Sequence, residues 1–523
     1  MLRRIIIGAI VAILMALARP VVATSFTDVD PPTGTGKTQV VLHGALRTRF
    51  ADLYNLDLDR GTTPSGLPLF PVPADDPTGQ NIYASDMRLR FDGMLVSPGG
   101  GFDVKVRADV LNDISLGSTP VGVPAASTSQ EPSSLIAIER AYGEAFTPFG
   151  VLAAGRMGND WGLGMLANGG DCADCDSSDS VDRVAFLTPL LGHIFAVAYD
   201  FSATLATARE PDAIRWIDLA PSTDVRTFTF AFLKWRSPRS VARRRAAGRV
   251  TFDYGAFVSH RTQPNDVPTS YLPVATPTEF SSAQIVQRDY QATTVDGWLR
   301  LVSPFVHVEL EAAYLNASIG QTSLLPGVLL RGTATSNQLG AALESEVGGH
   351  GQPFHFGLDA GYASGDPAPG FGAYPGIDAP APQPGELDGP QASYPNDLTV
   401  DNFRFHPDYR IDQILFHEII GTVTDAIYVR PHLRWRLFDA GPSSLTFTAA
   451  VIASWAVDPS STPSGQRPLG VEIDPSLVWA HRDGFSAVLD TAYFQPFSAF
   501  DNPVQHLTAK PAALARLRLV YGF

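Results

Sequence analysis

The chain has 523 residues, of which 45% are hydrophobic and 17% are charged, and its formal net charge is −15 at pH 7. This acidic balance argues against nucleic acid as a partner, because binding to phosphates needs a basic surface. The length would allow two or three soluble domains, but 46 glycines and 42 prolines are spread along the chain, and stretches with helical periodicity are almost absent. We find no domain boundary.

Residues 1–23 have the pattern of a signal peptide. Arg3 and Arg4 supply positive charge, Ile5 to Ala18 form a short apolar core, and small residues follow. This apolar run of about 14 residues is shorter than the roughly 18 that a membrane-spanning helix needs. We therefore expect export, followed by a lead over 24–38 and a single domain over 39–523.

The first strong strand pattern lies between residues 83 and 110. Met87, Leu89 and Phe91 alternate with Arg88 and Arg90, and the same period continues after a turn at 97–101. Similar alternation recurs at 306–311, at 427–437 and at 513–523. A membrane barrel shows this period because apolar side chains face lipid and polar ones face the lumen. A soluble sandwich also alternates, but would rarely place so many charges on successive strands.

Two cysteines lie in a long connection over 158–181. Cys172 and Cys175 follow a signal peptide, so a small disulfide within this loop is expected. Clustered carboxylates suit a hard cation, which makes the loop a weak candidate calcium site. Its candidate ligands are Asp171, Asp174, Asp176, Asp179 and Asp182. The alternative is a solvated acidic loop clipped by the disulfide. We predict no other cofactor.

The longest connection runs over 365–424. It has a proline-rich half followed by Ile411, Ile414, Leu415 and Ile419, whose spacing predicts a helix. A loop of this length in a compact fold is usually functional or disordered. We expect it to fold into or over the lumen as a constriction, with an external cap as the alternative.

The last segment ends on an aromatic residue. Leu517, Leu519, Tyr521 and Phe523 share one face. This terminus resembles the C-terminal strand signature that the barrel-assembly machinery recognises. Counting from near Gln39, we predict an all-β fold, a transmembrane antiparallel barrel of about 18 strands (16 to 18) with short periplasmic turns and long external loops. It is expected in the bacterial outer membrane, surrounded by outer-membrane lipid.

Two stretches resemble a known family. LGVEIDPSLVWAHRDGFSAVLDTAYFQPFSAF at 469–500 looks like the penultimate hairpin of alginate-export barrels, and GRMGNDWGLGML at 155–166 resembles their strand end with a Trp-Gly loop. The resemblance covers less than a tenth of the chain and implies a large barrel. Pro475 departs from the pattern, since it lacks a backbone donor, and predicts a bulge or irregular pairing.

Charged residues on the expected lumen face are the candidate functional residues. Barrel closure would place one basic wall across the first and last strands, and an acidic patch roughly opposite. The predicted pore-lining residues are Arg47, Arg49, Arg88, Arg90, Lys105, Arg107, Arg430, Arg434, Arg436, Arg516 and Arg518, with Glu309 and Glu311 on the acidic side beside Glu344, Glu346 and Asp359. Such walls would orient charged solutes and favour anions. The alternative is that these charges pair with one another.

The sequence contains no complete catalytic or nucleotide-binding motif. Residues 31–38 nearly spell a phosphate-binding loop, but Pro31 replaces its first glycine. His417 and Glu418 begin like a zinc-protease helix, yet Gly421 stands where the second histidine belongs. No nucleophile elbow is present. We predict a non-enzymatic, porin-like channel for passive diffusion of small solutes, with anions or saccharides as candidates. Exopolysaccharide export and a structural or adhesive barrel are the alternatives, and a hydrolase is disfavoured.

Overall fold

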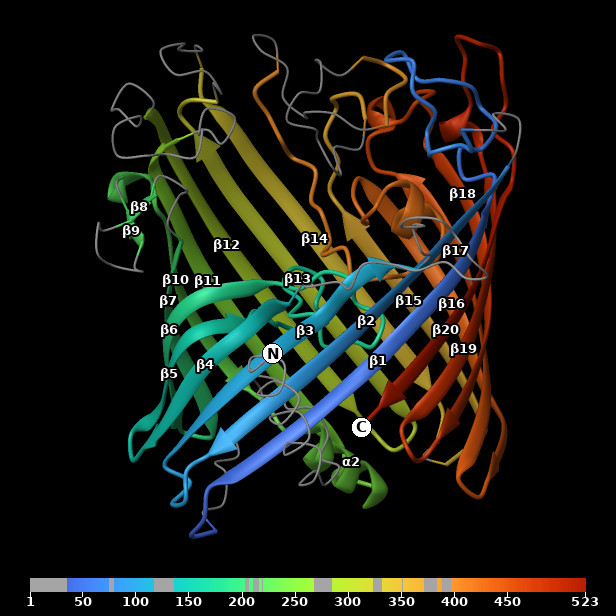
Figure 1. The fold of residues 1–523 in the computed structure, drawn as a ribbon. Helices are drawn as coiled ribbons and strands as arrows, with labels where there is room; N and C mark the ends of the chain where they lie inside the picture. The colour runs from blue at the N-terminus through green and yellow to red at the C-terminus, as the bar shows by residue number, and fades with distance from the viewer. Residues whose placement is uncertain are drawn as a thin grey trace, which may run out of the picture.

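The chain forms one closed barrel of 18 antiparallel strands (Figure 1). The computed structural model describes residues 35–74, 80–116, 136–202, 207–209, 216–218, 220–267, 285–322, 332–349, 351–370, 383–387 and 397–523. The predicted signal peptide and most of the lead over 24–38 lie outside these residues. The predicted strand number is confirmed.

The wall strands are β1 (Gln39–Tyr54), β2 (Asn81–Val96), β3 (Phe102–Ser115), β4 (Ala137–Thr147), β5 (Gly150–Gly158), β6 (Ser180–Leu190), β7 (His193–Ser202), β10 (Val225–Lys234), β11 (Thr251–Asp266), β12 (Val286–Val302), β13 (Val306–Ile319), β14 (Ala334–Val347), β15 (Phe354–Ala363), β16 (Ala426–Ala440), β17 (Ser443–Ala456), β18 (Pro468–His481), β19 (Phe485–Pro496) and β20 (Ala512–Gly522). Each pairs with the next in chain order, and β1 pairs with β20 to close the ring. A small ribbon of β8 (Thr207–Arg209) and β9 (Trp216–Asp218) stands apart from the ring.

The outer face of the wall is apolar. On β10, Phe228 and Phe230 are exposed by 63% and 51%, while Thr229 between them turns inward. Exposed aromatic and branched side chains recur on the outward positions of the other strands. This is the surface that a membrane barrel presents to lipid. Within the described residues, no helix is long and apolar enough to span a membrane.

Connections alternate between short and long. Two-residue turns join β4 to β5 and β16 to β17, whereas the connections before β2, β4, β6 and β12 are long. The short turns gather at one end and the long loops at the other (Figure 1). Helix α2 (Pro238–Ala246), between β10 and β11, is an exception at the short-turn end.

Pro475 sits within β18 without a bulge. Its pairing with Ala449 of β17 keeps the register, while the pairing with β19 passes from Ile473 to Ser476 with no shift. The β17–β18 register shift lies at Trp455 instead. The irregularity at Pro475 is therefore limited to the β19 side, since proline has no N–H to give to the ladder.

Candidate functional site in the barrel lumen

Segment 159–179, between β5 and β6, crosses the interior of the barrel. At one end, Trp161 donates to Asp296 of β12 at 2.7 Å, and the backbone N–H of Leu163 donates to Glu311 of β13 at 2.5 Å. Near its other end, Arg88 of β2 donates to the carbonyl of Cys175. Because β2 and β13 lie on opposite sides of the ring, the segment divides the lumen (Figure 1).

Arginines on β1 and β20 hold this segment by its carboxylates. Arg49 is paired in register with Arg518, so two like charges lie side by side. Asp174 contacts Arg518 and lies 3.3 Å from Arg49, and Asp176 lies 2.8 Å from Arg49 and 2.9 Å from Arg47. Arg47 is 1% exposed. Neighbouring arginines are tolerated here because the carboxylates lie between them.

The rest of the predicted basic wall is also paired. Arg107 lies 2.6 Å from both Asp92 and Asp171. Further contacts join Arg90 to Asp109 at 2.8 Å, Lys105 to Glu144 at 2.9 Å, and Arg516 to Glu418. The structure brings these basic residues together as predicted. Their charges, however, are paired with carboxylates of the same chain.

Ionisation of the two central carboxylates is strongly favoured. Burial opposes it, but Arg518, Arg410 and Arg49 outweigh burial and hold the pKa of Asp174 below its ordinary value. Burial likewise opposes ionisation of Asp176, and hydrogen bonds and charge from Arg49 and Arg410 lower its pKa. Both carboxylates therefore stay charged near neutral pH.

In the loop with the predicted calcium site, the carboxylates contact basic side chains instead. Cys172 and Cys175 form a disulfide. Asp171, Asp174 and Asp176 face arginines, and Asp179 lies 3.7 Å from the ring of His406. In the described parts of the chain, no group of three or more His, Cys, Asp or Glu is placed to hold a metal. The calcium site stays a prediction without geometric support.

Segment 397–424 fills a second part of the lumen. The buried carboxylate of Glu472 on β18 accepts the backbone N–H groups of Gln413, Ile414 and Leu415 at 2.8–3.0 Å. Ile414 and Leu415 pack in one apolar cluster with Phe494 and Leu514, which face inward from β19 and β20. This part of the predicted constriction therefore lies inside the barrel.

The helix predicted around 411–419 was largely wrong. Only Leu415–Ile419 form a single π-helical turn. The apolar spacing was real, since Ile411, Ile414, Leu415 and Ile419 are all buried. However, carboxylates of Glu472 and Asp412 take the backbone N–H groups that would extend a helix. Burial, and then the charge of Glu472, raises the pKa of Asp412.

The two inner segments support each other. The N–H of His406 donates to the carbonyl of Met165 at 2.7 Å, and Asp408 accepts the N–H groups of Asp176 and Ser177 at 2.9 and 2.8 Å. Arg410 lies 2.7 Å from Asp176. The inner structure is thus one connected body fixed to both sides of the wall.

The predicted acidic patch is occupied as well. Glu311 accepts backbone N–H groups of segment 159–179, and Glu309 accepts from Trp298 at 3.1 Å. Two other members pair with arginines of β16: Asp359 with Arg430 at 2.7 Å and Glu346 with Arg434 at 2.7 Å. The third predicted arginine of that strand, Arg436, lies 3.5 Å from Asp439, which is outside the patch. For these residues, mutual pairing is the arrangement observed.

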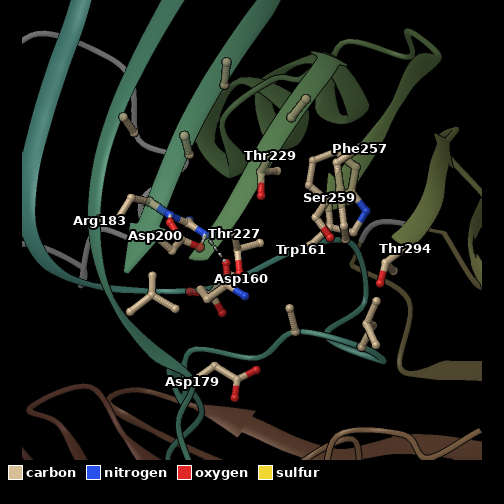
Figure 2. A pocket seen from close by; sticks show the side chains of 18 of the residues that line it. Asp160, Trp161, Asp179, Arg183, Asp200, Thr227, Thr229, Phe257, Ser259 and Thr294 are labelled. Carbon is tan, nitrogen blue, oxygen red and sulfur yellow. Dashed lines mark hydrogen bonds and ion pairs between the residues drawn. The ribbon is translucent and has the colours of Figure 1, made fainter. Parts of the chain in front are cut away.

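An open cavity of about 510 Å³ lies on the side of β6, β7 and β10–β12, next to segment 159–179 (Figure 2). Small side chains line it in one register row, each opposite the next on the neighbouring strand. The row is Ala185, Ala198, Thr229, Ser259 and Thr294. These side chains are too short to fill the space between the wall and segment 159–179.

A few polar and aromatic groups point into this cavity. Arg183 pairs with Asp200 at 2.5 Å, and Arg261 donates to Thr227 at 3.2 Å. On the inner segment, the Trp161 ring meets Phe257 edge-on, with centroids 5.1 Å apart. Figure 2 shows the labelled members of this set around one space: Trp161, Arg183, Asp200, Thr227 and Phe257. None of these residues was predicted as pore-lining. The sequence does mark this inward face, because Thr227, Thr229 and Ala231 alternate with phenylalanines.

Comparisons with known proteins found no matching family model and no matching curated protein. Solved structures do resemble the chain. OccAB3 of Acinetobacter baumannii has 11% identity and a TM-score of 0.45, with 92% of this chain and 98% of that one covered. OpdK of Pseudomonas aeruginosa has 10% identity and a TM-score of 0.43, covering 93% and 98%. A BenF-like porin of Pseudomonas fluorescens has 8% identity and a TM-score of 0.44, covering 92% and 98%. The comparisons do not show the alginate-export resemblance.

Proposed function

We propose that the protein is an outer-membrane channel through which small solutes pass by diffusion. One observation carries this proposal: the cavity of about 510 Å³ between the small-residue row and segment 159–179. Its size is in the range of small-molecule sites. The apolar outer face of the barrel supports a location in the outer membrane.

We place the path on the side of the lumen where this cavity lies. The arginines of β1–β3 and β20 are bound to segment 159–179, and segment 397–424 packs against β18–β20. A solute would therefore pass along β6, β7 and β10–β12. There it would meet hydroxyl groups, the Arg183–Asp200 pair and the ring of Trp161, while water fills the remaining space.

A pair of tryptophan variants on one strand tests this path. Ala198 faces the cavity, and its neighbour Val197 is 53% exposed on the outer face. We expect Ala198→Trp to reduce single-channel conductance in planar bilayers at least about threefold, because an indole would fill part of the cavity that the alanine side chain leaves open. Val197→Trp should leave conductance unchanged. A folded wild-type protein that conducts no ions and takes up no solute in liposomes would contradict the proposal.

Export of an acidic polysaccharide has less support. It would use free arginines of β16, but Arg430 and Arg434 each pair with a carboxylate at 2.7 Å. Arg436 lies farther along the strand, 3.5 Å from Asp439. We therefore put forward the diffusion channel alone.

A further inference from the structure

The connection between β10 and β11 differs from the other short-end turns. It runs from 235 to 250 and contains helix α2 (Pro238–Ala246), whereas β16 and β17 are joined by Gly441 and Pro442 alone. The helix lies at the short-turn end of the barrel (Figure 1). Such an addition is unnecessary for pairing two strands. Its contacts indicate where it acts.

One side of α2 is anchored to turns beyond its own hairpin. Arg245 donates to the carbonyl of Gly348, between β14 and β15, at 2.9 Å, and to that of Pro304, between β12 and β13, at 3.4 Å. Within its own connection, Arg244 donates to the carbonyl of Val250 at 2.8 Å. The helix therefore reaches inward from its hairpin along the rim instead of extending away from the barrel.

The other side of α2 faces a hollow of about 420 Å³. Ser237, Ser240 and Arg243 line it, and their spacing of three residues places them on one helix face. Leu187, Ile194 and Trp235 line both this hollow and the channel cavity. The hollow therefore continues the cavity toward the short-turn end, with α2 beside the opening.

The charge at this opening is positive. Its described lining includes Arg236 and Arg243 and no acidic residue. Arg236 shares the buried Asp253 with Arg300, at 2.6 and 2.8 Å, so two guanidinium groups face one carboxylate. Arg243 forms no ion pair with any described residue. By contrast, the cavity above brings Asp160, Asp179 and Asp200 near its arginines.

We propose that α2 is the anion-selecting element of the channel, placed at its periplasmic exit, with Arg243 as the residue that sets the preference. The inference rests on the proposed channel function. A fixed positive charge beside the opening of a water-filled path raises the local concentration of anions and lowers that of cations. Anion preference thus comes from α2, because the wall arginines bind segment 159–179 instead.

The test is the reversal potential of single channels in a potassium chloride gradient. We expect the wild-type protein to prefer chloride, and Arg243→Glu to lower the chloride-to-potassium permeability ratio about tenfold. Arg243→Ser should give an intermediate ratio. The shift should shrink at high salt, because salt screens a charge at an open mouth.

Arg249→Glu is the matched control. Arg249 is exposed in the same connection but does not line the hollow, so its reversal should leave the permeability ratio at the wild-type value. An equal shift in both variants, or none in Arg243→Glu, would overturn the role of α2 while leaving the channel intact. Failure of the proposed function is distinguishable, because then the wild-type protein itself would carry no current.

Discussion

The two sides of the lumen are built on the same strand ladder and reach opposite outcomes. On β20 and β1–β3, long arginines reach inward and bind the inner segment through Asp171, Asp174 and Asp176. On β6, β7 and β10–β12, alanine, serine and threonine leave a gap to the same segment. The position of the open path is therefore set by side-chain length and charge, because backbone pairing is alike on both sides.

Removing the carboxylates of segment 159–179 that bind the arginines of β1 and β20 should have the largest effect. Asp174→Asn combined with Asp176→Asn leaves Arg47, Arg49 and Arg518 without their central partners. Breaking one partner of a buried pair costs about 3 kcal/mol. We expect segment 159–179 to detach, conductance to rise severalfold and thermal stability to fall, measured by bilayer recording and heat denaturation.

Asp182→Asn controls for the loss of a charge. Asp182 pairs with Arg156 on the surface, where the two side chains are 40% and 51% exposed. Surface pairs contribute less than about 1 kcal/mol. If this variant opened the channel as widely as the double variant, the inner carboxylates would not be what holds the segment.

Removing the contact that holds the other end of segment 159–179, on β13, should have a smaller effect on conductance. Glu311 is fully buried on β13 and accepts N–H groups of the inner segment, including that of Leu163. Glu311→Ala leaves these donors unpaired at a cost of about 1–3 kcal/mol. Because the arginine end stays attached, we expect noisier currents and a smaller rise in mean conductance. Glu309→Gln, on the same strand but without a contact to the segment, should record like the wild-type protein.

The disulfide should contribute less again. It closes a very short loop, and chain entropy for such a loop amounts to about 2 kcal/mol. The carbonyl of Cys175 is also held by Arg88. Cys172→Ser combined with Cys175→Ser should lower thermal stability slightly and keep the conductance of the wild-type channel. A large increase would mean that the bridge, rather than the ion pairs, fixes the segment.

Mild acid should have the smallest effect. Arginine contacts lower the pKa of both Asp174 and Asp176 below the ordinary value of 3.8. A depressed pKa gives stability that is fully present above that ordinary value and is lost only as the pH falls through the lowered one. Conductance should therefore stay constant from about pH 7 to about pH 4. An opening of the channel near pH 5 would contradict the pairing.

The strands of the barrel wall were predictable from local sequence. The contacts of the segments that fold into the lumen were not. Alternation such as Met87, Leu89 and Phe91 against Arg88 and Arg90 defines a strand and its two faces, whatever lies elsewhere. The partners of those arginines are fixed by how a distant segment folds inward. Arg88, for example, binds the carbonyl of Cys175. No local period encodes such a contact.

The candidate site was missed for a related reason. Charge on the inner face does not mark the open path, because charged side chains such as Arg49 and Glu311 bind the inner segment. The open side is marked by small residues such as Ala198 and Thr229, which carry no chemical signature alone. Only the strand register, which places them in one row, shows that they line a common space.

That row makes the width of the path adjustable. Ala185, Ala198, Thr229, Ser259 and Thr294 each belong to a different strand, and their side chains take no part in the backbone ladder. Any one of them can grow or shrink by a few atoms without disturbing strand pairing or the ion pairs across the lumen. Size exclusion could thus diversify one position at a time, in evolution or by engineering, on an unchanged barrel.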